Sequence, residues 1–204
     1  MSVNIKYKNS SIAELTDTGT KTLKTAGKYC EADIIVENTK DGGGAKEPYI
    51  EETYDRFGNL TTAVLHGLPK IRSNMFAECN LLTSVTIPNS VTEIGFQAFF
   101  RCSGLESLTL PDSVTIINSE AFRQTGLMSF TIPSTVINIF HSVFYACGDL
   151  TSVTFNGTPN SIGSGIFRDC PKLTTINVPW AEGAVSGAPW GATNATINYN
   201  YKGA

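Results

Sequence analysis

One pattern recurs every 22 or 23 residues through the middle of this 204-residue chain. Three apolar residue types mark it, and each returns in five successive units with a single step of 22 residues. The three series are Phe76, Phe99, Phe122, Phe144 and Phe167; Leu82, Leu105, Leu127, Leu150 and Leu173; and Ile71, Ile94, Ile117, Ile139 and Ile162. A repeat of this length is typical of solenoids, in which each unit buries its apolar residues against its neighbours.

Each unit contains a short alternating segment that predicts a β-strand. In the first full unit Val85 and Ile87 alternate with polar residues, and Pro88 ends the strand because it lacks the N–H that a ladder needs. We expect the same strand at residues 108–110, 130–132, 153–155 and 176–178. Stacked units would place parallel strands roughly 4.8 Å apart. The predicted fold is mainly β, a right-handed leucine-rich-repeat solenoid with a parallel sheet, short helical or 3-10 turns and a cap at both ends.

The run IGFQAFFRCSGLESLTLP at residues 94–111 resembles the BspA-like leucine-rich repeats of surface proteins from oral and gut bacteria. Five units between residues 65 and 178 carry this resemblance. The pattern changes at Thr125, which replaces a cysteine, and at Phe140, which stands where Gly95 and Gly163 follow the isoleucine. We expect the turn at Phe140 to be distorted. The resemblance implies an adhesin-like module that binds protein or glycan.

The flanking segments predict further units. Residues 1–40 hold alternating segments at residues 3–7, 20–25 and 34–37, and predict a small β attachment module. Their sequence NIKYKNSSIAEL, followed by TKTLKTAGKYCEADIIVEN, resembles a module of tail-associated proteins in prophages of gut Firmicutes. A module this small buries little core by itself, so we expect it to pair with another copy or to dock onto a larger body. Residues 1–45 are therefore predicted to drive self-association or assembly.

The remaining boundaries follow from composition and turn signals. Residues 41–48 are predicted to be a flexible linker, because residues 42–44 are all glycine. Residues 49–65 predict an N-terminal hairpin cap, residues 66–178 the repeats, and residues 179–204 a C-terminal cap.

Charge and motif content exclude several function classes. The formal net charge is −3 and only 16% of residues are charged, so the basic surface of a nucleic-acid-binding protein is missing. No apolar run reaches the length of a membrane span, and no signal peptide is visible at the N-terminus. No nucleophile, phosphate-loop or zinc-hydrolase motif occurs. We therefore expect no catalytic activity, no metal, no cofactor and no membrane insertion.

Four of the five cysteines share one repeat position: Cys79, Cys102, Cys147 and Cys170. Stacking would separate them along the axis by roughly 5, 15 and 20 Å from the first, so they cannot converge on one tetrahedral zinc ion. Neighbouring repeats are close enough for a disulfide, so geometry alone does not forbid one. We predict a column of buried, reduced thiols.

Hydroxyl side chains offer the best candidate binding surface. The chain has 24 Thr and 17 Ser, and many fall on the outward positions of the predicted strands. These positions are Ser84, Thr86, Ser107, Thr109, Ser129, Thr131, Ser152, Thr154, Thr175 and Asn177, which we call the hydroxyl face. It could present donors and acceptors to a protein or glycan at a fixed spacing. The alternative is that Thr simply suits an exposed strand.

A second row follows the phenylalanine series and contains Phe100, Arg123, Tyr145 and Arg168. Aromatic and Arg side chains are the types that dominate protein interfaces, so these four are candidate interface anchors. The alternative is that the two rings pack inward against the next repeat. We call this row the aromatic–arginine column.

Two functions remain open. The first is a non-enzymatic binding module that recognises protein or glycan at a bacterial cell surface. The second is a structural or receptor-binding component of a prophage tail, attached through the N-terminal module. Cytoplasmic synthesis followed by assembly into a virion would need no signal peptide, which favours the second setting, with the cell surface as the alternative. The identity of the ligand is beyond the sequence.

Overall fold

The computed structural model describes residues 21–22, 33–34, 49–54 and 59–203, the first three ranges by their backbone alone. Strands β1 (Lys21–Thr22) and β2 (Asp33–Ile34) pair antiparallel. β1 lies inside the segment predicted at residues 20–25, and β2 overlaps the start of the one predicted at residues 34–37. The segment predicted at residues 3–7 and the linker predicted at residues 41–48 lie outside the described residues.

A hairpin stands at the N-terminal end of the repeats. Strands β3 (Tyr49–Tyr54) and β4 (Leu60–His66) pair antiparallel, and β4 then pairs parallel with β6 (Ser84–Thr86). Leu60, Ala63 and Leu65 of β4 are buried in the same core as the repeats. The hairpin therefore covers the apolar end of the stack with a strand of opposite direction.

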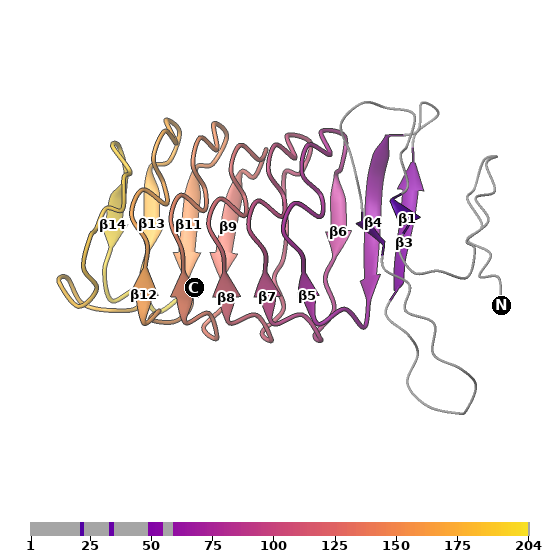
Figure 1. Ribbon diagram of the computed structural model, residues 1–204. Coiled ribbons are helices and arrows are strands. Elements are labelled where there is room, and N and C mark those ends of the chain that lie inside the picture. The colour runs from indigo at the N-terminus through magenta and orange to yellow at the C-terminus, as the bar shows by residue number, and fades with distance from the viewer. Residues whose placement is uncertain (1–20, 23–32, 35–48, 55–58, 204) are drawn as a thin grey trace.

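The strands predicted from alternation form one side of the coil. They are β9 (Ser129–Ile132), β11 (Ser152–Phe155), β13 (Thr175–Asn177) and β14 (Thr196–Asn198), paired parallel and in register. Figure 1 shows these strands in a row that continues toward β6 and β4. β9, β11 and β13 bury their central apolar residues, such as Val153, and leave polar neighbours outward, while Ile197 of the terminal β14 is half-buried.

The predicted strand at residues 108–110 is absent. Leu108 and Leu110 are buried and Thr109 is exposed, as in a strand, yet no ladder forms there. The connection from this repeat into the next is one residue shorter than elsewhere, and Gly126 in it lies against the carbonyl of Ser103. After this shorter connection the Met128 N–H donates to the Glu106 carbonyl at 3.1 Å, but no ladder continues from this bond.

A second parallel sheet, which the sequence reasoning missed, lies on another side of the coil. Its strands are β5 (Lys70–Ile71), β7 (Glu93–Ile94), β8 (Ile116–Ile117), β10 (Asn138–Ile139) and β12 (Ser161–Ile162). Figure 1 shows them as a second row below the first. Two residues are too few for visible alternation, so only the isoleucine series marks these strands in the sequence.

The remaining side of each repeat is a tight turn instead of the predicted helical or 3-10 segment. No helix occurs among the described residues. Each turn contains i→i+3 bonds, such as Ala77 N–H to the carbonyl of Asn74 at 3.1 Å. It also contains residues with positive φ, such as Asn74 at 59° and Glu78 at 63°. A left-handed residue every few positions prevents a helix from propagating.

Backbone hydrogen bonds between repeats run in two directions. In the turns, N–H groups donate to the following repeat, as Phe76 does to Ala98 at 2.8 Å. Beside the strands they donate to the preceding repeat, as Gly95 does to Ile71 at 2.8 Å. The Phe140 N–H donates to the Ile117 carbonyl of the preceding repeat at 3.0 Å, as Gly95 does to Ile71. The prediction of a distorted turn at Phe140 is therefore wrong. The Phe140 side chain is 43% exposed and points away from the core, which removes the steric conflict.

The phenylalanine series forms the centre of the core. Phe76, Phe99, Phe122, Phe144 and Phe167 stack ring on ring, with centroids 5.2, 5.5, 5.4 and 5.8 Å apart. At the C-terminal end Trp180 and Trp190 are buried and meet Phe155 edge-on or tilted, which closes the core. The prediction of a mainly β, capped parallel-sheet solenoid is confirmed.

Candidate functional site

The structure places the hydroxyl face on one side of the coil. Ser84, Thr86, Ser107, Thr109, Ser129 and Thr131 are exposed, and Ser152, Thr154, Thr175 and Asn177 are half-buried. Register pairing sets Ser129 beside Ser152, and Ser152 beside Thr175. The second column follows the same register two residues later along each strand. The two columns therefore run side by side along the coil.

A second set of hydroxyls in the repeats donates to backbone carbonyls of the preceding repeat. Ser113 Oγ donates to the carbonyl of Val91 at 2.6 Å, and Thr151 Oγ1 to that of Met128 at 2.8 Å. The same bond is made by Thr83, Ser90, Thr92, Ser103, Thr115, Thr135 and Thr174. The abundant Ser and Thr thus include a set that joins the repeats together.

The hydroxyl face differs because its members make few side-chain hydrogen bonds. Within the described part of the chain, one side-chain hydrogen bond joins two of its members, from Asn177 Nδ2 to Thr154 Oγ1 at 3.1 Å. The other hydroxyls of the face donate to no described protein group. They can therefore offer both a donor and an acceptor to a ligand.

The face is longer than the sequence predicts. In β4, Thr62 and Val64 pair with Ser84 and Thr86, which adds a repeat at one end. In β14, Thr196 and Asn198 pair with Thr175 and Asn177, which adds a repeat at the other. Asn198 Nδ2 donates to Asn177 Oδ1 at 2.8 Å, so the second column ends in linked amides. Extending the repeat step by 21 or 22 residues in each direction would have found these positions.

The aromatic–arginine column lies in the tight turns, away from the strands. The Arg123 guanidinium carbon lies 5.3 Å from the ring centre of Phe100 and 4.8 Å from that of Tyr145. The guanidinium carbon of Arg168 lies 5.8 Å from the same Tyr145 ring. The Phe100 and Tyr145 rings are half-buried. They lie between the two alternatives predicted from the sequence, exposed interface anchors and rings packed inward. Each ring thus contacts a guanidinium group of the following repeat.

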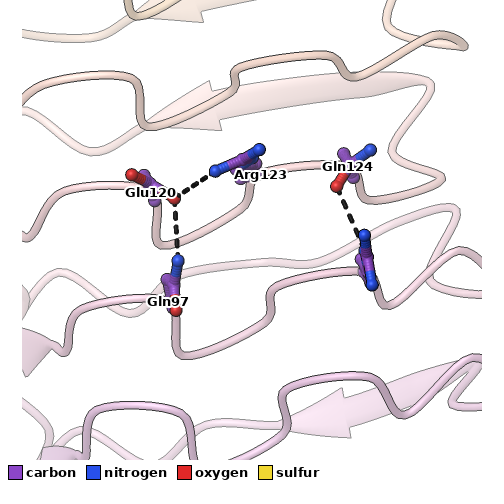
Figure 2. A network of polar contacts seen from close by, with 5 residues as sticks. Gln97, Glu120, Arg123 and Gln124 are labelled. Carbon is purple, nitrogen blue, oxygen red and sulfur yellow. Dashed lines mark hydrogen bonds and ion pairs between the residues drawn. The ribbon is translucent and has the colours of Figure 1, made fainter.

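A polar network holds Arg123 of this column, as Figure 2 shows. The Glu120 carboxylate accepts from Arg123 Nη1 at 2.8 Å and from Gln97 Nε2 at 2.8 Å. The Arg123 hydrogen bond holds the pKa of the Glu120 carboxyl below its usual range, and Gln97 acts in the same direction. Arg123 is therefore fixed by a carboxylate while its flat faces contact rings.

A second chain of contacts in the same turns centres on Arg101. Its Nη1 donates to Glu78 Oε1 at 3.1 Å and its Nε to Gln124 Oε1 at 3.3 Å. Its guanidinium carbon also lies 4.8 Å from the Phe100 ring centre. The repeat spacing puts Glu78, Arg101 and Gln124 at one position of successive repeats, but it does not show that their side chains bond.

The thiols occupy one buried column, as their shared repeat position implies. Cys102, Cys147 and Cys170 are free, and each donates to a phenylalanine carbonyl of the preceding repeat at 2.9–3.0 Å. Burial raises the pKa of the Cys102 and Cys147 thiols, and that of Cys170 to about 12. Thr125 fills the missing position, and its hydroxyl donates to the Phe122 carbonyl at 3.0 Å.

Cys79 differs from the other thiols because it is in a disulfide bond. The prediction that all four are reduced is therefore wrong for this residue. Cys79 stands in the first repeat, where the residue 23 positions before Phe76 is Thr53 instead of a phenylalanine.

The other described side chains that could act in catalysis or bind a metal ion are scattered. His141 Nδ1 accepts from the Ser164 N–H at 3.1 Å and lies 3.0 Å from Ser164 Oγ, on the exposed surface. In the described ranges no carboxylate contacts this pair, so it lacks the orienting group of a hydrolase triad. The described residues also contain no group of His, Cys, Asp or Glu arranged to hold a metal ion. Nor do they contain a helix that could span a bilayer.

Comparison with known proteins gives a family match over the repeats. The model of the "BspA type Leucine rich repeat region" matches residues 69–183 in six copies. No curated protein sequence matches the chain. The match begins after the first 68 residues, so the resemblance of residues 1–40 to a tail module stays a prediction.

Solved structures share the fold. A leucine-rich-repeat protein of T. pallidum matches with 27% identity and a TM-score of 0.51, covering 64% of this chain and 69% of its own. One from Bacteroides ovatus matches with 23% identity and a TM-score of 0.56, covering 81% and 47%. A leucine-rich cell surface protein from Faecalibacterium prausnitzii matches with 26% identity and a TM-score of 0.47, covering 82% and 55%. The chain thus spans about half the length of the last two.

Proposed function

The chain belongs to the BspA-type leucine-rich-repeat family, and from that premise we propose that it is a non-enzymatic binding module for a protein or glycan. We place its ligand at a bacterial cell surface or a phage surface. Repeat proteins of this kind expose long regular surfaces, and function depends on which side chains those surfaces present.

The observation that carries this proposal is the difference between the two sets of hydroxyls. Thr83, Thr115 and Thr151 donate to backbone carbonyls and so belong to the fold. Thr86, Thr109 and Thr131 are exposed at successive outward positions, and their hydroxyls are available to a ligand. A column of such groups suits a partner with a repeating polar backbone, because each repeat adds one hydroxyl at the same position of the coil.

The proposal is tested by comparing matched triple variants on glycan and extracellular-matrix arrays. Thr86→Val, Thr109→Val and Thr131→Val together should reduce binding of every array ligand by about tenfold or more, since each lost hydrogen bond contributes about 1 kcal/mol. The melting temperature should stay close to that of the wild type.

The control carries Thr83→Val, Thr115→Val and Thr151→Val. It should keep the array profile and lose stability, because these hydroxyls bond to the fold. Arrays without a ligand, or a face variant that binds like the wild type, would remove the hydroxyl face as the binding surface.

Self-association through residues 1–45 is a separate proposal, supported by the small size of the predicted module. Light scattering should give a larger assembly for the intact chain than for residues 46–204. Equal monomeric masses would contradict it. A self-associating N-terminal segment would also suit assembly into a phage tail, the second setting suggested by the sequence.

A further inference from the structure

Rings and guanidinium groups alternate along the aromatic–arginine column, and the alternation ends differently at its two ends. The Phe100 ring contacts the guanidinium groups of Arg101, at 4.8 Å, and of Arg123, at 5.3 Å. Tyr145 lies between Arg123, at 4.8 Å, and Arg168, at 5.8 Å. Arg123 contacts two rings. Arg168 contacts Tyr145 alone and is the last cation of the column.

Arg168 is also less compensated than the two other arginines that contact rings in these turns. Arg123 pairs with Glu120 at 2.8 Å and Arg101 with Glu78 at 3.1 Å. Arg168 has Asp169, whose carboxylate oxygen lies 4.0 Å from its Nε, and the two side chains are 71% and 59% exposed. An ion pair this long and this exposed contributes little. Arg168 therefore keeps N–H donors for another acceptor.

The next repeat supplies no ring to continue the alternation. The residue 23 positions after Arg168 is Gly191, with φ of 93°. A Cβ atom at Gly191 would lie 3.1 Å from Gly165 Cα and 3.2 Å from the Arg168 backbone nitrogen. The backbone is thus too close to the preceding repeat for a side chain to fit. The face of Arg168 away from Tyr145 receives no aromatic partner from this position.

We infer that Arg168 and Tyr145 form a docking point for an aromatic side chain of a protein partner, with an adjacent carboxylate. The partner's ring would stack on the outer face of the Arg168 guanidinium and so extend the alternation by one member. Its carboxylate would accept from the free guanidinium edge in the planar geometry that Arg favours. This surface lies in the turns and is separate from the hydroxyl face on the strands.

The surface has the composition of an interface hot spot. Tyr and Arg are enriched at such positions, and a partly fixed side chain loses less freedom when it binds. Tyr145 is half-buried and is held by Arg123 on its inner face. Arg168 thus presents its guanidinium from a ring that the neighbouring repeat already positions.

A displayed library of random cyclic peptides, selected on the full chain, tests this inference. Enriched peptides should carry Trp or Tyr next to Asp or Glu. Synthetic copies should bind Arg168→Ala at least about tenfold more weakly, with Arg168→Lys intermediate, because Lys keeps the charge and loses the planar stacking face. Arg101→Ala is the matched control, since it removes an exposed ring-contacting Arg at the other end, and it should leave affinity unchanged.

Three results would overturn the inference: no enriched peptide, enriched peptides without an aromatic residue, or equal binding to wild type and Arg168→Ala. Folding of Arg168→Ala is checked by its urea midpoint, which should not change because the side chain is largely exposed. The triple Val variant of the hydroxyl face should retain peptide binding, and Arg168→Ala should retain the array profile. Failure of this inference is thereby distinguished from failure of the proposed function.

Discussion

Two residues in each turn have a left-handed backbone, although few of them are glycine. Their φ angles lie between 52° and 66°. They are Asn74, Gln97, Glu120, Ser142 and Gly165 in one column, and Glu78, Arg101, Gln124, Ala146 and Asp169 in the other. A non-glycine residue in this conformation costs roughly 1–2 kcal/mol. Many of these side chains, including Gln97 and Arg101, offset part of this cost by bonding across repeats.

Ala146 has the strain without a bonding side chain, so it should tolerate glycine best. Ala146→Gly should raise the free energy of unfolding by roughly 0.5–1 kcal/mol, because relief of the left-handed strain exceeds the entropy that glycine adds to the unfolded chain. Urea denaturation measures the difference. Ala77→Gly, a half-buried alanine without positive φ, is the control and should lower stability by a similar amount. Loss of stability in both variants would contradict the explanation.

Glu120 should make stability depend on pH. Its pKa is lowered, mainly by the Arg123 hydrogen bond, so its stabilisation is present above the unfolded value of about 4.3 and is lost as pH falls through the folded pKa. Glu120→Gln should therefore cost about 0.5–1 kcal/mol at pH 7 and almost nothing near pH 2. Urea unfolding at both pH values measures this. The exposed Glu182→Gln should show no such change, and an equal cost for Glu120→Gln at both pH values would refute the assignment.

At the scale of the elements, a single hydroxyl can join two repeats. Ser113 donates to the Val91 carbonyl at 2.6 Å and is half-buried, whereas Ser129 is exposed on the hydroxyl face. Ser113→Ala should lower the free energy of unfolding by about 1 kcal/mol, because a carbonyl loses its donor. Ser129→Ala should change it by less than about 0.5 kcal/mol. Chemical denaturation of both variants checks this, and equal effects would mean that the inter-repeat bond contributes nothing.

The predictable part of the fold is the part that depends on side-chain periodicity. The Phe, Leu and Ile series predicted the coil, and alternation predicted strands at β9, β11 and β13. The strands of the second sheet are two residues long and carry no alternation, so they were missed. The strand at residues 108–110 has the correct alternation but pairs with neither β6 nor β9, so alternation alone does not predict the backbone ladder.

The sequence predicted which residues lie on the candidate surfaces, but not which contacts these residues make. Repeat spacing alone placed Ser129 outward, and the same spacing brought Phe100, Arg123 and Tyr145 into one row. It could not show that each Arg covers a ring, because that depends on the path of both turns. Nor could it separate Ser113 from Ser129, since the acceptor of Ser113 is a backbone carbonyl 22 residues earlier.

At the scale of the whole molecule, the thiol column should report the integrity of the coil. Burial raises the pKa values of Cys102, Cys147 and Cys170, so little reactive thiolate forms while the repeats stay stacked. Iodoacetamide at about pH 8 should leave these three residues unmodified in the native protein and label them in denaturing guanidinium, as peptide mass spectrometry would show. Rapid labelling of any one of them in the native protein would contradict its buried position.

The two directions of inter-repeat hydrogen bonding also determine the electrostatics of the ends. In an α-helix all peptide dipoles point the same way, which gives the termini opposite partial charges. Here the N–H of Phe76 points toward one end of the coil and that of Gly95 toward the other, and the same opposition recurs in later repeats. The two sets of dipoles oppose each other, so lengthening the coil adds less field along its axis than lengthening an α-helix does. Attraction of a charged partner then depends on individual side chains such as Arg168.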